Sequence, residues 1–432
     1  MRGSRFLFNF ELMNKLIIVA VLLIIGCSKK EKLDDIVNVE FQLPSESENN
    51  ETNESVEQKG IPCLDGFAEI YPCSGYDLLS HIPLSKFRSE SANDNWGWTD
   101  SSSGKEYVLS GLDDGTAFID ISDPKNPIFL GKLLTESSPS PWRDIKVYKN
   151  FAFIVSEAPN HGLQVFDLTR LRNQTQEFQN FSADTTLSDF GNAHNLWINE
   201  STGYAYVFGS NLYQGGPLFI DINDPLNPEI VGGYADDSYS HDAQIVNYQG
   251  PDTEFRGREI LFGSNSDGGE NNQIVIIDVT NKSNPIKISS KNYLASGYTH
   301  QGILSKDQKY FFLGDELDEL FYGTPTLTRI FDLSELSNPK IHLNYFAQVN
   351  AIDHNGYIKE DLFYMASYTA GLRVLDISQV EKKRVNEIGF FDTFPSDNNP
   401  KFNGAWNVYP FFDSGVIAIN DIDSGLFLVK ES

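Results

Sequence analysis

One hydrophobic and polar pattern recurs along the chain from about residue 115 to its end. Each copy has a small residue, a stretch of alternating apolar positions, an Asp, another apolar residue and then Ser, Thr or Asn. Two copies show the pattern in full, GTAFIDISDPKNP at 115–127 and GPLFIDINDPLNP at 216–228. Alternation with a period of two is typical of a half-buried strand, and Asp-Pro-x-x-Pro is turn chemistry. The pattern predicts many short strands joined by tight turns.

The spacing of the copies predicts the architecture. The shared aspartates follow one another at 47, 54, 57, 54 and 44 residues: Asp120, Asp167, Asp221, Asp278, Asp332 and Asp376. A period of about 40–50 residues with several strands per copy is the signature of a propeller blade. A seventh copy ends the chain as GLFLVK at 425–430. We predict an all-β fold, a seven-bladed β-propeller of four-stranded blades.

The two ends of the predicted propeller, residues 61–432, complement each other. The last copy has only three strand segments, NVYPFF, GVIAIND and GLFLVK, so it lacks an outer strand. The segment YDLLSHIPLS at 76–85 precedes the first blade and has no place in the repeat. A closed propeller has no free sheet edges. We therefore predict that residues 61–90 supply the missing outer strand of the last blade, together with a loop between Cys63 and Cys73.

The first 60 residues do not contain the repeat and have a different composition. Residues 14–27, NKLIIVAVLLIIGC, are too short to span a bilayer and fit an export signal. Their end resembles a bacterial lipobox, so we expect residues 1–27 to be a lipoprotein signal peptide and Cys27 to carry lipid. An ordinary signal peptide is the alternative, and either Met1 or Met13 could be the start. Residues 28–60, poor in large apolar groups, are expected to form a disordered tether.

Charge and cysteine content narrow the partners and the compartment. The net charge of −27 disfavours binding to nucleic acid. A lipidated Cys27 would attach the protein to the outer membrane of a bacterium, on the periplasmic side or at the cell surface. Cys63 and Cys73 lie in PCLDGFAEIYPC, and in an exported protein they are expected to form a disulfide, with two free thiols as the alternative.

The repeat phrase resembles the LVIVD repeat, and longer stretches are similar to the choice-of-anchor B family of exported bacterial proteins. The stretches are YPCSGYDLLSHIPL, NDNWGWTD, SPWRDIKVYKNFAFIVSEAPNHGLQVFDLTRLR, GNAHNLWIN, SHDAQIVNYQGPDTEFRGREI, GYTHQGIL, DELDE and FNGAWNVYPFF, within roughly residues 61–430. The resemblance implies an envelope-attached propeller. It carries no settled activity, so the site has to be argued from the residues.

Histidines recur at one position of the repeat. Aligning the predicted first strands of the blades places seven residues at equivalent starts: Trp96, Arg143, His194, His241, His300, His354 and Trp406. First strands are expected to line the channel of a propeller, so the four imidazoles would form an arc on one face. Arg143 could receive a carboxylate or phosphate, and Trp96 and Trp406 could stack on a ligand such as a carbohydrate.

The second strands end on the same face and would add oxygen ligands from their ends: Asp113, Glu157, Asn211, Asn265, Asp315 with Glu316, Tyr368 and Asp421. Glu157 and Asp315 are expected beside the four histidines in a metal site for Zn or another first-row ion. Asn211, Asn265 and Asp421 would contribute to ligand binding. The acidic loops at 315–319 and 265–270 have calcium-like chemistry. A structural use of the arc, in which each His holds a neighbouring blade, is the alternative.

Two functions follow from these features. The favoured one is a lipid-anchored binding or scaffold module for another envelope protein or ligand, with a metal ion at the axial face. The alternative is a metal-dependent enzyme, a hydrolase or an oxidoreductase, that uses the histidine arc. No P-loop, GxSxG, HExxH or dinucleotide fingerprint occurs in the sequence, which favours binding.

Overall fold

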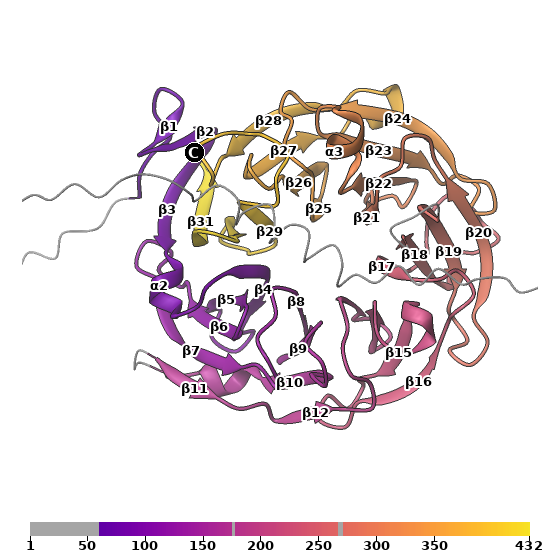
Figure 1. Ribbon diagram of the computed structural model, residues 1–432, viewed down its shortest axis with the longest axis horizontal. Coiled ribbons are helices and arrows are strands. Elements are labelled where there is room, and N and C mark those ends of the chain that lie inside the picture. Colours follow the sequence, from indigo (N-terminus) through magenta and orange to yellow (C-terminus); the bar gives the residue numbers. More distant parts are fainter. Residues whose placement is uncertain (1–59, 175–177, 267–270) are drawn as a thin grey trace, which may run out of the picture. The chain divides into compact units, whose positions relative to one another are not determined.

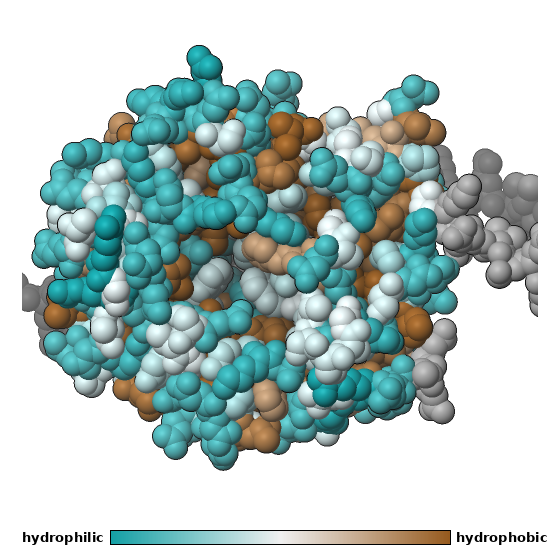
Figure 2. All heavy atoms as spheres, turned by 180° about the vertical axis from the view of Figure 1, so that it is seen from behind, coloured by the Kyte–Doolittle hydropathy of each residue, from teal (hydrophilic) through white to brown (hydrophobic). Residues whose placement is uncertain are grey.

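The computed structural model describes residues 60–432, except 175–177 and 267–270. The expectations for the signal peptide, Cys27 and the tether lie outside these residues. The described part contains seven antiparallel sheets arranged as blades around a central axis (Figure 1). The predicted seven-bladed β-propeller is confirmed. From one side its surface is hollowed at the centre and mostly hydrophilic around the hollow (Figure 2).

The first three blades follow the chain from residue 92. Blade 1 is β4 (Ala92–Thr99), β5 (Glu106–Leu112), β6 (Gly115–Asp120) and β7 (Ile128–Leu134), and β11 (Gln179–Phe181) adds to its outer edge in parallel. Blade 2 is β8 (Arg143–Tyr148), β9 (Phe151–Ser156), β10 (Leu163–Asp167) and β12 (Thr185–Leu187). Blade 3 is β13 (Asn195–Asn199), β14 (Tyr204–Phe208), β15 (Leu218–Asp221) and β16 (Glu229–Gly233).

The next three blades repeat the order, with the first strand innermost. Blade 4 is β17 (Ser240–Asn247), β18 (Glu259–Asn265), β19 (Gln273–Asp278) and β20 (Ile286–Asn292). Blade 5 is β21 (Thr299–Leu304), β22 (Tyr310–Asp315), β23 (Leu327–Asp332) and β24 (Lys340–Phe346). Blade 6 is β25 (Gly356–Lys359), β26 (Leu362–Ala366), β27 (Leu372–Asp376) and β28 (Asn386–Phe391). Its outer edge is extended by β2 (Tyr71–Ser74) and β1 (Phe67–Ala68).

Blade 7 closes the ring with both ends of the described chain. It is β29 (Ala405–Tyr409), β30 (Val416–Asp421), β31 (Gly425–Glu431) and, as its outer strand, β3 (Tyr76–Ile82). β3 pairs antiparallel with β31 from Tyr76↔Glu431 to Ile82↔Leu426. The predicted N-terminal closing strand is confirmed, and the disulfide between Cys63 and Cys73 lies just before it.

Helices are short and lie on connections. They are α2 (Leu84–Phe87), α3 (Asp318–Tyr322) and the 3₁₀ turns η1 (Leu168–Leu171), η2 (Tyr213–Gly215) and η3 (Val380–Lys382). In the described part of the chain, no helix is long and apolar enough to cross a membrane.

The repeated aspartates hold the turns that follow the third strands. In all six copies the carboxylate accepts a hydrogen bond from the backbone N–H two residues on, as from Ser122 to Asp120 and from Thr280 to Asp278. The apolar core lies between blades, where residues such as Phe118 of blade 1 and Phe166 of blade 2 stack at 4.6 Å between ring centroids. Rigid blades therefore fix the position of the channel-lining first strands.

Candidate axial metal site

The four histidines of the repeat form one continuous arc at the start of four neighbouring first strands. Their ring centroids are separated by 4.2 Å from His194 to His241, 4.3 Å from His241 to His300 and 4.3 Å from His300 to His354. The ring of Trp406 follows at 4.7 Å from His354. The structure therefore brings together five of the seven residues that the repeat placed at the channel rim.

Trp96 does not belong to the rim, and that part of the sequence alignment is wrong. The N–H of Ile145 donates to Asp94, and the N–H of Leu196 in the next blade donates to Asp144. Asp94 and Asp144 are therefore equivalent, which makes Asn93 the blade 1 counterpart of Arg143 and of the histidines.

The ring of Trp96 lies deeper in the channel. It packs edge-on against Tyr357 and Tyr409, with the Lys146 Nζ 4.6 Å from its centroid. The register of β4 against β5 shifts between Ala92 and Asn95, as it does at the starts of β17, β21 and β29, so this shift does not set blade 1 apart from the other blades. Trp96 is a packing residue here, and no rim surface is left for it to stack on a ligand.

Arg143 is at the rim but does not face a ligand. Its side chain is 2% exposed, and its three donor nitrogens are taken by the Leu112 carbonyl, His161 and the Thr135 hydroxyl. The expectation of a free guanidinium across the ring is wrong. Burial lowers the pKa of Arg143 to about 10 and that of its neighbour His161 to about 4.

The polar residue after several of the rim positions joins neighbouring blades. The Asn195 amide donates to the His241 carbonyl at 3.0 Å, and the Gln301 amide donates to the Gly356 carbonyl at 3.2 Å. The Asn407 amide closes the ring by donating to the Asn95 carbonyl at 2.7 Å. Structural use therefore accounts for Asn195, Gln301 and Asn407, and the imidazoles have to be considered separately.

Two of the imidazoles have one ring nitrogen occupied by backbone. His241 Nδ1 lies 2.9 Å from the His300 carbonyl, and His354 Nδ1 contacts the Trp406 carbonyl. A carbonyl can only accept, so Nδ1 carries the proton in both rings and Nε2 keeps its lone pair. This is the tautomer in which a histidine binds metal through Nε2.

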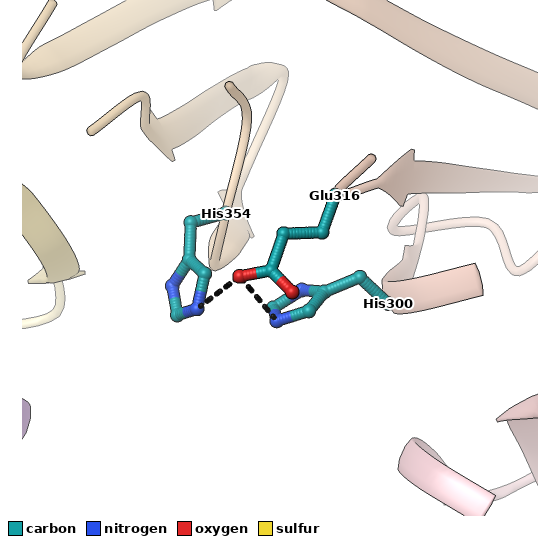
Figure 3. Close-up of side chains that lie close together, drawn as sticks. All are labelled: His300, Glu316 and His354. Carbon is teal, nitrogen blue, oxygen red and sulfur yellow. Dashed lines mark ion pairs between the residues drawn. The ribbon is translucent and has the colours of Figure 1, made fainter. Parts of the chain in front are cut away.

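Glu316 supplies the oxygen at this part of the arc, and Asp315 does not. The Glu316 Oε1 lies 3.9 Å from His300 Nε2 and 3.7 Å from His354 Nε2, between the two rings (Figure 3). Donor atoms of His300, Glu316 and His354 all lie within 4.8 Å of one another. Asp315 faces the other way and accepts from the Gly297 and Tyr298 N–H groups and the Tyr293 hydroxyl. Its prediction as a metal ligand is wrong because adjacent strand residues point to opposite sides.

Tyr368 holds Glu316 in place from the neighbouring blade. Its hydroxyl donates to Glu316 Oε1 at 2.8 Å, and its ring lies 4.8 Å from that of His354. Tyr368 has a φ of 22°, a conformation that a bulky residue rarely adopts. Such strained positions concentrate at functional sites, where the surrounding structure maintains them.

Glu157 and His194 form the other end of the arc. The Glu157 Oε1 and His194 Nδ1 are 2.6 Å apart, and the two side chains are 30% and 12% exposed. Burial opposes protonation of His194, but the hydrogen bond and the charge of Glu157 outweigh it and raise the pKa of His194. This pair differs from the rest of the arc, where a carbonyl or no protein group meets Nδ1.

The remaining imidazoles are held neutral. Burial, followed by the neighbouring histidines, lowers the pKa of His241 and of His300 well below the ordinary value. Burial also lowers the pKa of His354 to about 3 and raises that of Glu316 to about 7. Three neutral imidazoles are therefore present in the arc at neutral pH, in the form that metal binding requires, and two of them, His300 and His354, lie beside Glu316.

The other predicted ligand residues serve their own loops. Asn211 accepts from the Gly191 N–H, Asn265 bonds Ser240 and the Asp237 carbonyl, and Asp421 accepts from the N–H groups of residues 423 and 424. Residues 267–270 of the loop at 265–270 lie outside the described residues. None of the three contacts the arc through a hydrogen bond that the described structure contains.

Two charged clusters were not foreseen from the sequence. Lys146 Nζ contacts Asp144 and lies 3.5 Å from Asp94 below the arc, and burial followed by Asp144 raises the pKa of Asp242 nearby to about 7. In the acidic loop after Asp315, Asp318 and Glu319 are 0% and 1% exposed, so this loop is buried rather than solvated. The placement of Asp94, Asp144 and Asp242 directly after the rim position was the available signal for the first cluster.

Comparison with known proteins supports the fold and the repeat. The LVIVD repeat family matches residues 112–135 and 268–292, which include the third and fourth strands of blades 1 and 4. No match is found among curated proteins.

Among solved structures, the β-propeller domain of Myceliophteria thermophila Cps50 (Swd1) has 13% identity over 83% of this chain and 99% of its own, with a TM-score of 0.52. Kuenenia stuttgartiensis hydrazine synthase has 14% identity over 76% of this chain and 92% of its own, with a TM-score of 0.52. At such identities the likeness concerns the propeller fold alone.

Proposed function

We propose that this protein is an envelope-anchored binding module that docks a partner protein on the propeller face where the histidine arc lies. The observation that carries the proposal is the distribution of exposed aromatic side chains. In the described part of the chain, six such residues lie on the connections or strand ends at that end of the blades: Trp142, Tyr213, Phe321, Tyr322, Phe346 and Phe402. Aromatic residues are enriched where proteins bind each other.

The aromatic side chains are densest beside the candidate metal site. α3 follows Glu316 directly and leaves Leu320, Phe321 and Tyr322 exposed at 43%, 62% and 51%. Leu294, on the connection that α3 contacts through the Tyr322 hydroxyl, is 92% exposed. Apolar side chains gathered on one exposed face of a soluble domain mark an interaction surface.

Charge indicates the kind of partner. The chain carries 60 acidic and 33 basic residues, so its field attracts a partner with a basic surface and repels polyanions. We therefore propose a basic envelope protein as the partner and no nucleic acid. The closed ring supports this use, because a rigid scaffold loses little conformational entropy on binding.

We also propose that lipid on Cys27 anchors the protein at the bacterial outer membrane. We further propose that the protein belongs to the choice-of-anchor B family. Both are supported by sequence features, the stretch 14–27 and the family-like phrases across 61–430. A Cys27→Ala variant is expected to lose incorporation of labelled fatty acid and to leave the membrane fraction. Labelling of the variant equal to the wild type would show that Cys27 is not the anchor.

Photo-crosslinking in cells of the source organism tests the docking face. A crosslinking amino acid at Phe321 or Phe402 should capture the same partner band, identified afterwards by mass spectrometry. The matched control is Ile286, which is 55% exposed but lies at the opposite end of its blade. Capture of that band from position 286 with equal yield, or no capture from either aromatic position, would contradict the proposal.

A metal-dependent hydrolase is the second candidate, and the Glu157–His194 pair favours it. A carboxylate that orients an imidazole beside an open channel is the arrangement of a general base. The expected result is hydrolysis of chromogenic esters that falls at least 100-fold in Glu157→Gln. Absence of hydrolysis in the wild type would contradict the hydrolase and leave the binding module as the proposed function.

A further inference from the structure

We propose that His300, Glu316 and His354 bind one first-row divalent metal ion at the axial face. The site lies on the same face as the proposed docking surface, but its assignment does not rest on that proposal. It uses the start of β21, the residue after the end of β22 and His354, two residues before β25 begins at Gly356, so two adjacent blades build it. Figure 3 shows one Glu316 oxygen between the two rings, each of which turns a nitrogen toward it.

The spacing of the donor atoms fits a metal ion better than direct contact. At 3.7 and 3.9 Å, the distances from Glu316 Oε1 to the two Nε2 atoms are too long for hydrogen bonds. Zinc with ligands at about 2.0–2.1 Å in tetrahedral geometry separates its donors by about 3.3–3.4 Å. The two distances from Glu316 exceed this separation by about 0.3–0.6 Å, and the two Nε2 atoms, which lie within 4.8 Å of each other, have to approach as the ion binds.

The surroundings orient the donors as metal ligands are oriented. The Trp406 carbonyl accepts from His354 Nδ1, and the Tyr368 hydroxyl donates to Glu316. Hydrogen bonds of this kind fix the tautomer and direction of ligating side chains. His300 has no counterpart to this contact, because its Nδ1 is buried and has no hydrogen-bond partner in the described structure, so His354 and Glu316 are the donors that their surroundings orient.

A purely structural role of the histidines does not explain why Glu316 lies among them. Holding the next blade occupies only Nδ1 of His241 and His354, and it requires no carboxylate. Glu316 nevertheless enters the arc with a side chain only 17% exposed and without a Lys or Arg among its ion pairs. A buried carboxylate of this kind is costly unless a proton or a cation accompanies it. A bound divalent ion supplies the cation.

The donor set indicates the class of metal. Two imidazoles and a carboxylate, without sulfur, suit Zn²⁺ and Fe²⁺ rather than Cu⁺ or Ca²⁺. Three protein ligands leave at least one coordination position open. Water or a group from a bound partner could occupy it.

Calorimetric titration of the chelator-treated full chain with ZnCl₂ tests the site. We expect one ion per chain with sub-micromolar affinity in the wild type. Glu316→Gln keeps the size of the side chain and an acceptor for Tyr368, and it should weaken binding at least 10-fold. The double variant His300→Ala/His354→Ala should lose the site. His342→Ala is the matched control, since His342 lies on β24 of the same blade and contacts only the Val380 carbonyl and the Tyr310 ring.

Each outcome decides the assignment. Loss in the arc variants with full binding in His342→Ala supports it. Binding by the double variant equal to the wild type, or no stoichiometric binding by the wild type, overturns it. Because His354 also holds blade 7, the Glu316→Gln result is decisive if the double variant unfolds: unchanged affinity there overturns the proposal as well.

Discussion

Replacing Glu319 by Gln should make the propeller more stable at neutral and alkaline pH. Glu319 is 1% exposed; its Oε1 accepts from the Leu327 N–H and its Oε2 has no partner in the described structure. Burial first, and then the nearby carboxylates of Asp353 and Asp318, raise its pKa far above the ordinary value. Arg329 compensates only one of these charges, through its contact with Asp318. Glu319 therefore stays protonated in the folded protein.

The sign and size of the effect follow from proton linkage. In the unfolded chain a Glu ionises near pH 4.3, so above that pH the folded state holds one more proton than the unfolded state. Stability then falls as pH rises, by about 1.4 kcal/mol per pH unit for one proton. The Gln variant has no such proton. Its advantage over the wild type should be small at pH 5 and should grow by roughly 4 kcal/mol by pH 8.

Urea unfolding followed by tryptophan fluorescence, at several pH values from 5 to 8, measures this difference. Glu381→Gln is the matched control, because that side chain is 78% exposed. Its unfolding free energy should follow the wild type at every pH. Parallel profiles for wild type and Glu319→Gln, or a variant that is less stable at pH 8, would refute the reasoning about the buried acidic loop.

Three further predictions concern the closure and the channel. Leu78→Ala in the closing strand, a side chain 3% exposed, should cost about 2–5 kcal/mol of unfolding free energy in urea titration, and a loss below 1 kcal/mol would contradict closure by β3. Cys63→Ser/Cys73→Ser opens a loop of sequence separation 10 and should cost about 3 kcal/mol, whereas an unchanged unfolding midpoint would show that the disulfide is dispensable. Asp144→Ala leaves Lys146 without its nearest carboxylate and should cost about 3–5 kcal/mol by thermal unfolding; no shift would show that water replaces the pair.

The fold was predictable because its information is local and repeated. The six aspartates that mark the copies each hold a turn through their own backbone neighbourhood, so the period could be counted without any knowledge of distant contacts. Closure was also predictable, since three strand segments at the C-terminal end and one unassigned segment before blade 1 complete a blade.

The site was predictable only in outline, because its details depend on register. The four histidines shared a repeat position and do lie together. The start of blade 1 was misplaced by three residues, since Asn93 stands at the position that histidine holds in four other blades and Trp96 was aligned with the rim instead. The choice between Asp315 and Glu316 depends on which side of a strand end faces the channel. The burial of Arg143 depends on His161 and Thr135, which no repeat position indicates.

X-ray absorption at the zinc edge of the zinc-loaded protein tests the central claim most directly. The account predicts a first shell of nitrogen and oxygen at about 2.0–2.1 Å with the outer-shell scattering of two imidazoles. In Glu316→Gln the imidazole scattering should persist while the first shell loses its carboxylate oxygen. A first shell of oxygen alone, without imidazole scattering, would place the ion on surface carboxylates and contradict a metal site in the histidine arc.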